Sequence, residues 1–173
     1  TDGIAYTGVE TLNLDLGSGD DVLNVRGTTA ITNVDLAAGA DRAYVSDQAY
    51  VLLDQQPDML IGTLNDIHGT LNLQFGSGHS TLLVSDYSAA AGDSDVLITD
   101  RLAAARVRDA NLTATAEIAI VGLAPAGISY AAAGGDWTGG GRIWSGAGND
   151  TVVIDGTVYR AGRRTTTWLN TRL

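Results

Sequence analysis

The stretch Gly17-Ser-Gly-Asp-Asp-Val-Leu-Asn-Val25 joins a tight acidic turn with two glycines to a short β-branched strand. A near copy, Gly146-Ala-Gly-Asn-Asp-Thr-Val-Val-Ile154, lies far along the chain. Shorter words recur as well: Gly3-Ile-Ala-Tyr6 returns as Gly127-Ile-Ser-Tyr130, and Thr11-Leu-Asn-Leu14 returns as Thr70-Leu-Asn-Leu73. Such self-similarity is typical of repeat proteins, in which each copy is one unit that stacks on its neighbours.

The spacing of the glycine-containing turns indicates the length of one unit. The turn at Gly17 is followed about 20 residues later by a partial copy, Ala37-Ala-Gly-Ala-Asp41, and after nearly three such steps by Gly76-Ser-Gly-His-Ser80. About 20 residues suffice for one coil of two or three short strands, and strands of successive coils lie about 4.8 Å apart. We therefore expect an all-β fold, a parallel β-solenoid of the β-helix or β-roll type, with roughly 20 residues per coil.

The strand signals are short and regularly spaced. Most alternate apolar with polar residues and are bounded by Gly, Asp, Ser or Asn, as half-buried strands are. The expected strands cover residues 10–16, 22–25, 31–36, 43–46, 50–53, 70–75, 81–85, 96–99, 114–121, 142–144 and 151–154. Residues 100–108 fit either a short alanine-rich helix or a strand. Residues 131–141, mostly Gly and Ala, are expected to form a flexible excursion.

The amino-acid composition argues against some classes of binding partner. The chain has 173 residues, no Cys and a formal net charge of −10 at pH 7. All its acidic residues except Glu10 and Glu117 are Asp, which favours turns and offers oxygen ligands to calcium. We expect no nucleic-acid partner, because nucleic acid needs a basic surface. The longest uncharged run, residues 118–135, contains Pro125 and is too weakly apolar to span a bilayer, so we expect no membrane insertion.

The pattern Gly-x-Gly-x-Asp-x-(Leu/Val) at residues 17–23 and 146–152 resembles the hemolysin-type, or RTX, nonapeptide Gly-Gly-x-Gly-x-Asp-x-U-x. Residues 6–21 resemble the degenerate repeats of very large secreted bacterial calcium-binding or adhesin-like proteins. In that family, the glycines and the Asp line turns that hold calcium between successive coils of a β-roll. The resemblance implies Ca²⁺ as cofactor, with ligands at Gly17, Gly19, Asp21, Gly39, Asp41, Gly146, Gly148 and Asp150.

This chain departs from the family pattern at several positions. Leu16 and Ser145 stand where the first glycine of the nonapeptide belongs, and Ser80 stands where the third copy needs its Asp. The copies also do not follow one another every nine residues, as they do in a regular β-roll. A long array of calcium sites is therefore not expected.

The best candidate metal pair is Asp21 with Asp41, which we expect one above the other on one edge of the solenoid. Calcium takes about six to eight oxygen ligands, so backbone carbonyls and water would have to complete the site. The alternative is that these carboxylates are ordinary turn residues that accept hydrogen bonds from backbone amides. Asp150 is expected to have its stacked neighbour beyond Leu173, and Asp93 with Asp95 forms a weaker pair.

Catalytic signatures are sparse. His68 and His79 are isolated, and the sequence has neither a Cys nucleophile nor a Gly-x-Ser-x-Gly elbow. The three tryptophans, Trp137, Trp144 and Trp168, could form a platform for sugar stacking, but packing over the end of a sheet is the preferred interpretation. We expect a non-enzyme.

The predicted organisation is a single solenoid segment, residues 1–173. Residues 1–126 form one long repeat, and residues 127–173 form the start of a second, truncated repeat. We expect residues 165–173 to extend the solenoid into a neighbouring repeat or into another copy of the chain, end to end.

The predicted function is that of a calcium-stabilised structural segment of a large secreted or cell-surface bacterial protein, serving as scaffold, adhesin stalk or filament subunit. Surface polysaccharide is a further candidate partner. One competing interpretation is a carbohydrate-binding or carbohydrate-active β-helix, which a contiguous acidic or aromatic groove on one face would favour. Another is a metal-free β-sandwich, in which the 20-residue step is a coincidence of hairpin spacing.

Overall fold

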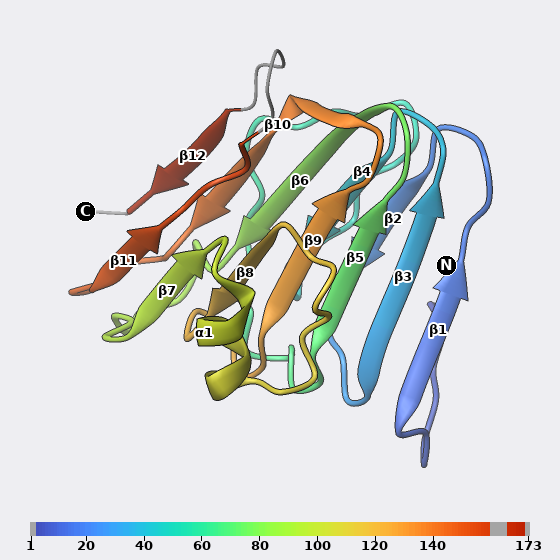
Figure 1. Cartoon of the computed structure of the whole chain (residues 1–173). Coiled ribbons are helices and arrows are strands. Elements are labelled where there is room, and N and C mark those ends of the chain that lie inside the picture. Colours follow the sequence, from blue (N-terminus) through green and yellow to red (C-terminus); the bar gives the residue numbers. More distant parts are fainter. Residues whose placement is uncertain (1–2, 160–165, 172–173) are drawn as a thin grey trace.

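The computed structural model describes residues 3–159 and 166–171 and consists of two largely parallel β-sheets with one short helix (Figure 1). Sheet A has the order β1(Thr11–Asp15), β3(Ile31–Ala37), β5(Leu71–Phe75), β9(Ile128–Ala132), β8(Ile118–Val121), β7(Val96–Thr99), β11(Val152–Asp155). Sheet B has the order β12(Thr167–Asn170), β10(Asp136–Trp144), β6(His79–Ser85), β4(Arg42–Val45), β2(Val22–Val25). Among these pairs, only β8 runs antiparallel to its neighbours, β7 and β9.

Consecutive strands lie in opposite sheets for most of the chain. The pairs β1–β2, β3–β4, β5–β6 and β9–β10 each place one strand in sheet A and the next in sheet B, beside the strands of the previous pair. Neighbouring hairpin strands would instead pair antiparallel within one sheet. The largely parallel pairing therefore contradicts hairpin spacing as the source of the 20-residue step; consecutive strands pair antiparallel only at β7–β8 and β8–β9 among the described strands.

The 20-residue step holds only between the first two strand pairs. Asn13 and Asn33 occupy equivalent positions 20 residues apart, whereas Asn33 and Asn72 are 39 apart, and Asn72 and Ser129 are 57 apart. Two long detours, residues 46–70 and 86–127, account for the larger steps. The strand that follows each detour nevertheless pairs parallel with the preceding strand of sheet A: β5 pairs with β3, with a register shift between Asp35 and Ala37, and β9 pairs with β5.

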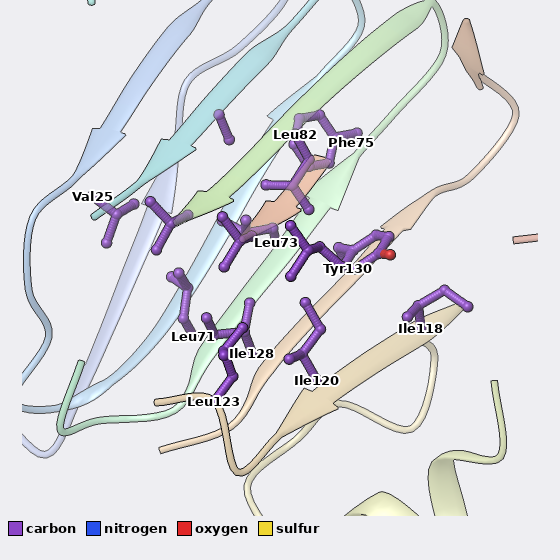
Figure 2. Packing of buried hydrophobic residues seen from close by; sticks show 14 of the residues in the cluster. Val25, Leu71, Leu73, Phe75, Leu82, Ile118, Ile120, Leu123, Ile128 and Tyr130 are labelled. Carbon is purple, nitrogen blue, oxygen red and sulfur yellow. The ribbon is translucent and has the colours of Figure 1, made fainter. Parts of the chain in front are cut away.

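The main core fills the space between the two sheets. Inward side chains alternate with outward ones along β3, whose burial switches at every residue from Ile31 to Leu36. Figure 2 shows the packed aliphatic residues together with Phe75 and Tyr130. Trp137 is also buried here and packs edge-on against both rings, with centroids 4.8 Å from Phe75 and 5.2 Å from Tyr130. Trp137 thus packs inside the sheets rather than forming a sugar platform.

Each sheet is also partly covered on its outer side. Val51 and Leu60, from the first detour, pack on Tyr44, Leu83 and Trp144 of sheet B. The helix α1 (Leu102–Arg108) packs on the β7–β8 part of sheet A (Figure 1), so residues 100–108 take the helical alternative. No helix in the described part of the chain is long and apolar enough to cross a membrane.

Several expected elements differ from the structure. Residues 50–53 form a loop rather than a strand, and residues 131–141 are the end of β9, a turn and the first part of β10 rather than a flexible excursion. β9 and β12 were not delimited as separate strands, although β12 lies within residues 165–173, which were expected to extend the solenoid, and pairs parallel with β10. The start and end of the predicted extension over residues 165–173 lie outside the described residues.

Candidate functional site

The turns that lead from sheet A to sheet B stack on one another at one edge of the molecule. The backbone N–H of Gly19 donates to the carbonyl of Ala38, and that of Gly39 donates to the carbonyl of Ser77. A Cβ atom placed on Gly39 would lie 1.8 Å from the carbonyl oxygen of Gly19. Glycine is therefore required at Gly39, because no side chain fits between the two turns.

Asp21 and Asp41 meet in these stacked turns. The backbone N–H of Asp21 donates to Oδ1 of Asp41 over 3.0 Å, and Asp41 is only 1% exposed. Burial raises the pKa of the Asp41 carboxyl; the hydrogen bond from Asp21 opposes the rise, and the charges of Asp21 and Asp20 add to it. Oδ2 of Asp21 is buried and has no hydrogen-bond partner among the described residues.

The neighbouring carboxylate, Asp20, also joins the first two turns. Its Oδ1 accepts a hydrogen bond from the backbone N–H of Ala40 over 2.8 Å. Asp20, in the first turn, thus accepts an amide of the second turn, and Asp41, in the second turn, accepts an amide of the first. Both contacts are the turn chemistry that the sequence left as the alternative to a metal site.

The third of the stacked turns differs from the first two in its polar side chains. Ser80 follows Asp41 in register and is buried, without a carboxylate. Beside it, Nδ1 of His79 lies 2.8 Å from Oδ1 of Asp136, and the hydroxyl of Thr138 donates to the same oxygen over 2.7 Å. Burial tends to raise the pKa of Asp136, but the bonds from His79 and Thr138 outweigh it and bring the pKa to about 2.

The second motif copy, with Gly146, Gly148 and Asp150, lies in a turn of the opposite sense, from sheet B to sheet A. Oδ1 of Asp150 accepts the backbone N–H of Asp93 over 2.9 Å, and the hydroxyl of Ser145 donates to Oδ2 over 2.5 Å. Asp150 therefore has a neighbour that the sequence analysis did not assign to it, the turn of Asp93, which lies 57 residues earlier. The neighbour expected beyond Leu173 stays a prediction. The Gly17 and Gly146 turns do not stack on each other.

Asp93 resembles Asp21 in one respect. Its Oδ2 is buried and has no hydrogen-bond partner within the described chain. Burial raises the pKa of the Asp93 carboxyl, and the negative charge of Asp150 raises it further. Gly148 approaches the backbone of Gly92 so closely that a Cβ atom on Gly148 would lie 2.5 Å from the Gly92 nitrogen.

A third acidic residue, Asp86, lies near this turn and is 4% exposed. Its Oδ1 accepts the backbone N–H of Leu64 over 2.7 Å and so holds the later part of the first detour. Burial raises its pKa to about 6; the bond from Leu64 opposes the rise, and the charges of Asp93, Asp150 and Asp47 reinforce it.

The sequence analysis missed a ladder of amide side chains on the outer face of sheet A. Nδ2 of Asn33 donates to Oδ1 of Asn13, and Nδ2 of Asn72 donates to Oδ1 of Asn33, each over 2.8 Å. The hydroxyl of Ser129 continues the row by donating to Oδ1 of Asn72 over 2.6 Å. The repeated word Thr-Leu-Asn-Leu at residues 11–14 and 70–73 carried the signal, since it puts Asn at the same strand position twice.

Within residues 3–159 and 166–171, no group of three or more His, Cys, Asp and Glu side chains is arranged to hold a metal ion. The predicted ligand residues Asp21 and Asp41 form one carboxylate pair, joined by the backbone N–H of Asp21. The predicted ligand Asp150 forms a second pair with Asp93, joined by the backbone N–H of Asp93. A scan against protein-family models, a search of curated proteins and a search of solved structures each found no match for this chain.

Proposed function

We propose that the chain is a non-catalytic structural segment, a parallel β-solenoid that belongs to a large secreted or cell-surface bacterial protein and serves as scaffold, adhesin stalk or filament subunit. The observation that carries this proposal is the joining of equivalent positions in successive strand pairs by side-chain hydrogen bonds. The asparagine ladder joins Asn13, Asn33 and Asn72 on sheet A, and Asp41 joins its turn to Asp21. Repeated lateral bonds of this kind make a stack stiff and fix its register.

Calcium is the second part of the proposal. Two buried carboxylate oxygens, Oδ2 of Asp21 and Oδ2 of Asp93, have no hydrogen-bond partner among the residues that the structure describes. Each lies beside a second carboxylate, Asp41 and Asp150 respectively. Carbonyl oxygens of Gly17, Gly19 and Gly39 would add ligands in the first turn, and those of Gly146 and Gly148 in the second, with water completing the set. Bound cations would also reduce the self-repulsion of a chain with net charge −10.

Thermal unfolding with calcium or with a chelator tests the metal. A ligand that binds only the folded state raises the melting temperature as its concentration rises. We expect calcium to stabilise the wild type, and we expect the shift to shrink in Asp21→Asn and in Asp93→Asn, which keep the side-chain size. Asp54→Asn, at an exposed position of the first detour, is the matched control and should retain the shift. Equal melts with calcium and with chelator for all variants would remove calcium from the proposal.

The end of the two sheets at β1 and β2 supports stacking on a neighbouring repeat or copy. Within the described chain, β1 pairs only with β3, and β2 pairs only with β4, so both have an open edge. A cavity of about 330 Å³ between them is lined in part by Leu12, Leu14 and Leu23. Open strand edges beside apolar side chains favour association.

Sedimentation velocity over a range of concentrations tests this association. We expect the wild type to form longer species as concentration rises, and Leu12→Lys to remain monomeric, because a lysine on an edge strand opposes pairing. Circular dichroism would check that Leu12→Lys is folded. A wild type that stays monomeric at every concentration would rule out end-to-end assembly of copies while leaving stacking within one chain unaffected.

A further inference from the structure

The outer face of sheet A contains a groove with a volume of about 420 Å³, within the range of about 300–1,000 Å³ typical of ligand sites. Its floor is formed by β1, β3 and β5, and Thr113 and Thr115 from the connection between α1 and β8 form part of its wall. That connection is held down where Asn72 donates to the carbonyl of Asn111 and accepts from the backbone N–H of Thr113. Figure 1 shows the connection passing in front of sheet A.

Two rows of polar side chains cross the floor of the groove. One row is the ladder Asn13, Asn33 and Asn72; the other consists of Asp15, Asp35 and Gln74, two residues further along each strand. Members of a row lie on adjacent strands, so they repeat about every 4.7–4.9 Å. The groove therefore offers the same kind of polar group at regular steps.

These side chains are positioned in advance and retain hydrogen-bonding capacity. Oδ1 of Asp15 accepts the backbone N–H of Gly17 over 3.0 Å, and Oδ1 of Asp35 accepts that of Ala37 over 2.9 Å. Within residues 3–159 and 166–171, Oδ2 of each carboxylate makes no hydrogen bond, nor does the side chain of Gln74. Groups that are fixed before binding lose little conformational freedom when a ligand arrives.

The negative charge of the groove determines which class of ligand it can bind. Asp15 and Asp35 stand directly opposite each other on paired strands, an arrangement of like charges that is unfavourable without a partner. Among the described residues, no Arg lines the groove. An anionic ligand would be repelled, whereas hydroxyl groups can donate to both carboxylates and exchange hydrogen bonds with the amides.

We propose that this groove binds a linear, uncharged polysaccharide that lies across β1, β3 and β5. Hydroxyl groups of successive sugars donate to Oδ2 of Asp15 and Oδ2 of Asp35, and Gln74 contacts the next unit. The ladder amide of Asn33 adds contacts from the neighbouring row. The length of one sugar in an extended chain is close to the strand spacing, so each strand meets one unit. This site does not depend on calcium or on end-to-end assembly.

Affinity gel electrophoresis tests the proposal, using soluble mixed-linkage β-glucan, xylan and galactomannan as neutral probes and polygalacturonate as the anionic probe. We expect at least one neutral polymer to retard the wild type in chelator as well as in calcium. Asp35→Asn and Gln74→Ala should each weaken that binding, Asp35→Asn by about tenfold or more because a charged acceptor is lost. Asp54→Asn, on the detour that covers the other sheet, should bind like the wild type.

The result can overturn the proposal in three ways. Retardation by none of the neutral polymers would reject the ligand class, and retardation by polygalacturonate alone would reject the role given to the charges. Equal binding by Asp35→Asn, Gln74→Ala and the wild type would move any site away from this groove. Near-identical circular dichroism spectra of the variants would exclude misfolding as the cause of weaker binding.

Discussion

The carboxylate of Asp41 accepts a hydrogen bond from the backbone N–H of Asp21, which lies 20 residues earlier in the adjacent turn. Asp150 accepts the N–H of Asp93 in the same way at the opposite edge, across 57 residues. In both pairs, the carboxylate of the later turn satisfies an amide of the earlier one, which would otherwise lack a partner. The motif Asp thus joins two turns directly, with or without an ion.

Replacing Asp41 tests the strength of this contact. Asp41→Ala leaves the Asp21 amide without its acceptor and should lower the free energy of unfolding by about 1–3 kcal/mol. Asp41→Asn keeps an Oδ1 acceptor in a buried position and should lose less. Urea unfolding in chelator measures both, with the exposed Asp54→Ala as control. Equal stabilities of Asp41→Ala and the control would contradict the role given to this bond.

The asparagine ladder should contribute to stability in the middle of sheet A. Asn33→Ala removes two hydrogen bonds, one to Asn13 and one from Asn72, and should cost about 1–3 kcal/mol. Asn65→Ala, at an exposed site in the first detour, should change stability by no more than about 0.5 kcal/mol. The comparison requires only equilibrium unfolding of the two variants, and the idea fails if they are equally stable.

The glycine turns should tolerate substitution very unevenly. Gly39→Ala places a Cβ 1.8 Å from the carbonyl oxygen of Gly19 and forces the stacked turns apart, which should cost about 1–3 kcal/mol or more. Gly3→Ala meets no atom within 4 Å, and the φ angle of Gly3 is not in the left-handed region, so it should be nearly neutral. Melting temperatures would distinguish the two; similar values would mean that the turns are not tightly stacked.

The pH dependence of stability should reflect Asp86. Its pKa is raised to about 6 in the folded chain, above the unfolded value near 4, so the folded state binds the proton more tightly. Its contribution to stability is therefore complete below pH 4 and is lost as pH rises through 6. Asp86→Asn keeps the acceptor for Leu64 and should be more stable than the wild type at pH 8, with the difference shrinking toward pH 4.

Unfolding of Asp86→Asn and the wild type across this pH range, in chelator, measures the effect. Asp66→Asn, which removes an exposed carboxylate of the first detour, is the control and should track the wild type at every pH. A constant difference between Asp86→Asn and the wild type from pH 4 to pH 8 would show that ionisation of Asp86 does not differ between the folded and unfolded states.

Several short strands bounded by turn residues could be read directly from the sequence. Residues 22–25 and 96–99 form strands with the predicted bounds, and residues 31–36 miss only the last residue of β3. β9 was not delimited because all five of its residues are buried and it lies in a long uncharged run, where the apolar pattern does not mark where a strand begins and ends. The mostly parallel pairing followed from the repeat spacing, which puts equal positions of successive copies side by side.

Two errors have specific local causes. Residues 50–53 have the composition of a strand, but the side chain of Asn24 bonds both the N–H and the carbonyl of Val51 and takes the place of a strand partner. The glycines of β10 suggested flexibility, yet they make room for neighbouring side chains. A Cβ on Gly139 would lie 1.9 Å from Oγ1 of Thr81, and one on Gly140 would lie 2.3 Å from the ring of Trp168.

The two carboxylate pairs were not equally predictable from the sequence. Asp21 and Asp41 were predictable neighbours because no insertion separates them and both follow a glycine turn. Asp93 and Asp150 were not, because most of the second detour and β9–β10 lie between them, and the turn before Asp93 lacks the two-glycine spacing. Only the structure shows that the irregular turn before Asp93 takes the place, beside the turn of Asp150, that a motif copy would occupy.

The first detour leaves β4 and returns to β5 without disturbing the pairing of β3 with β5. Arg42 anchors it by donating to the carbonyls of Leu53 and Gln55, and the exposed residue Gln56 follows immediately. Lengthening a flexible loop is inexpensive, at about 0.6 kcal/mol for each doubling. A foreign peptide grafted after Gln56 would therefore be presented to solvent on a rigid platform, which makes this chain a ready carrier for epitope display.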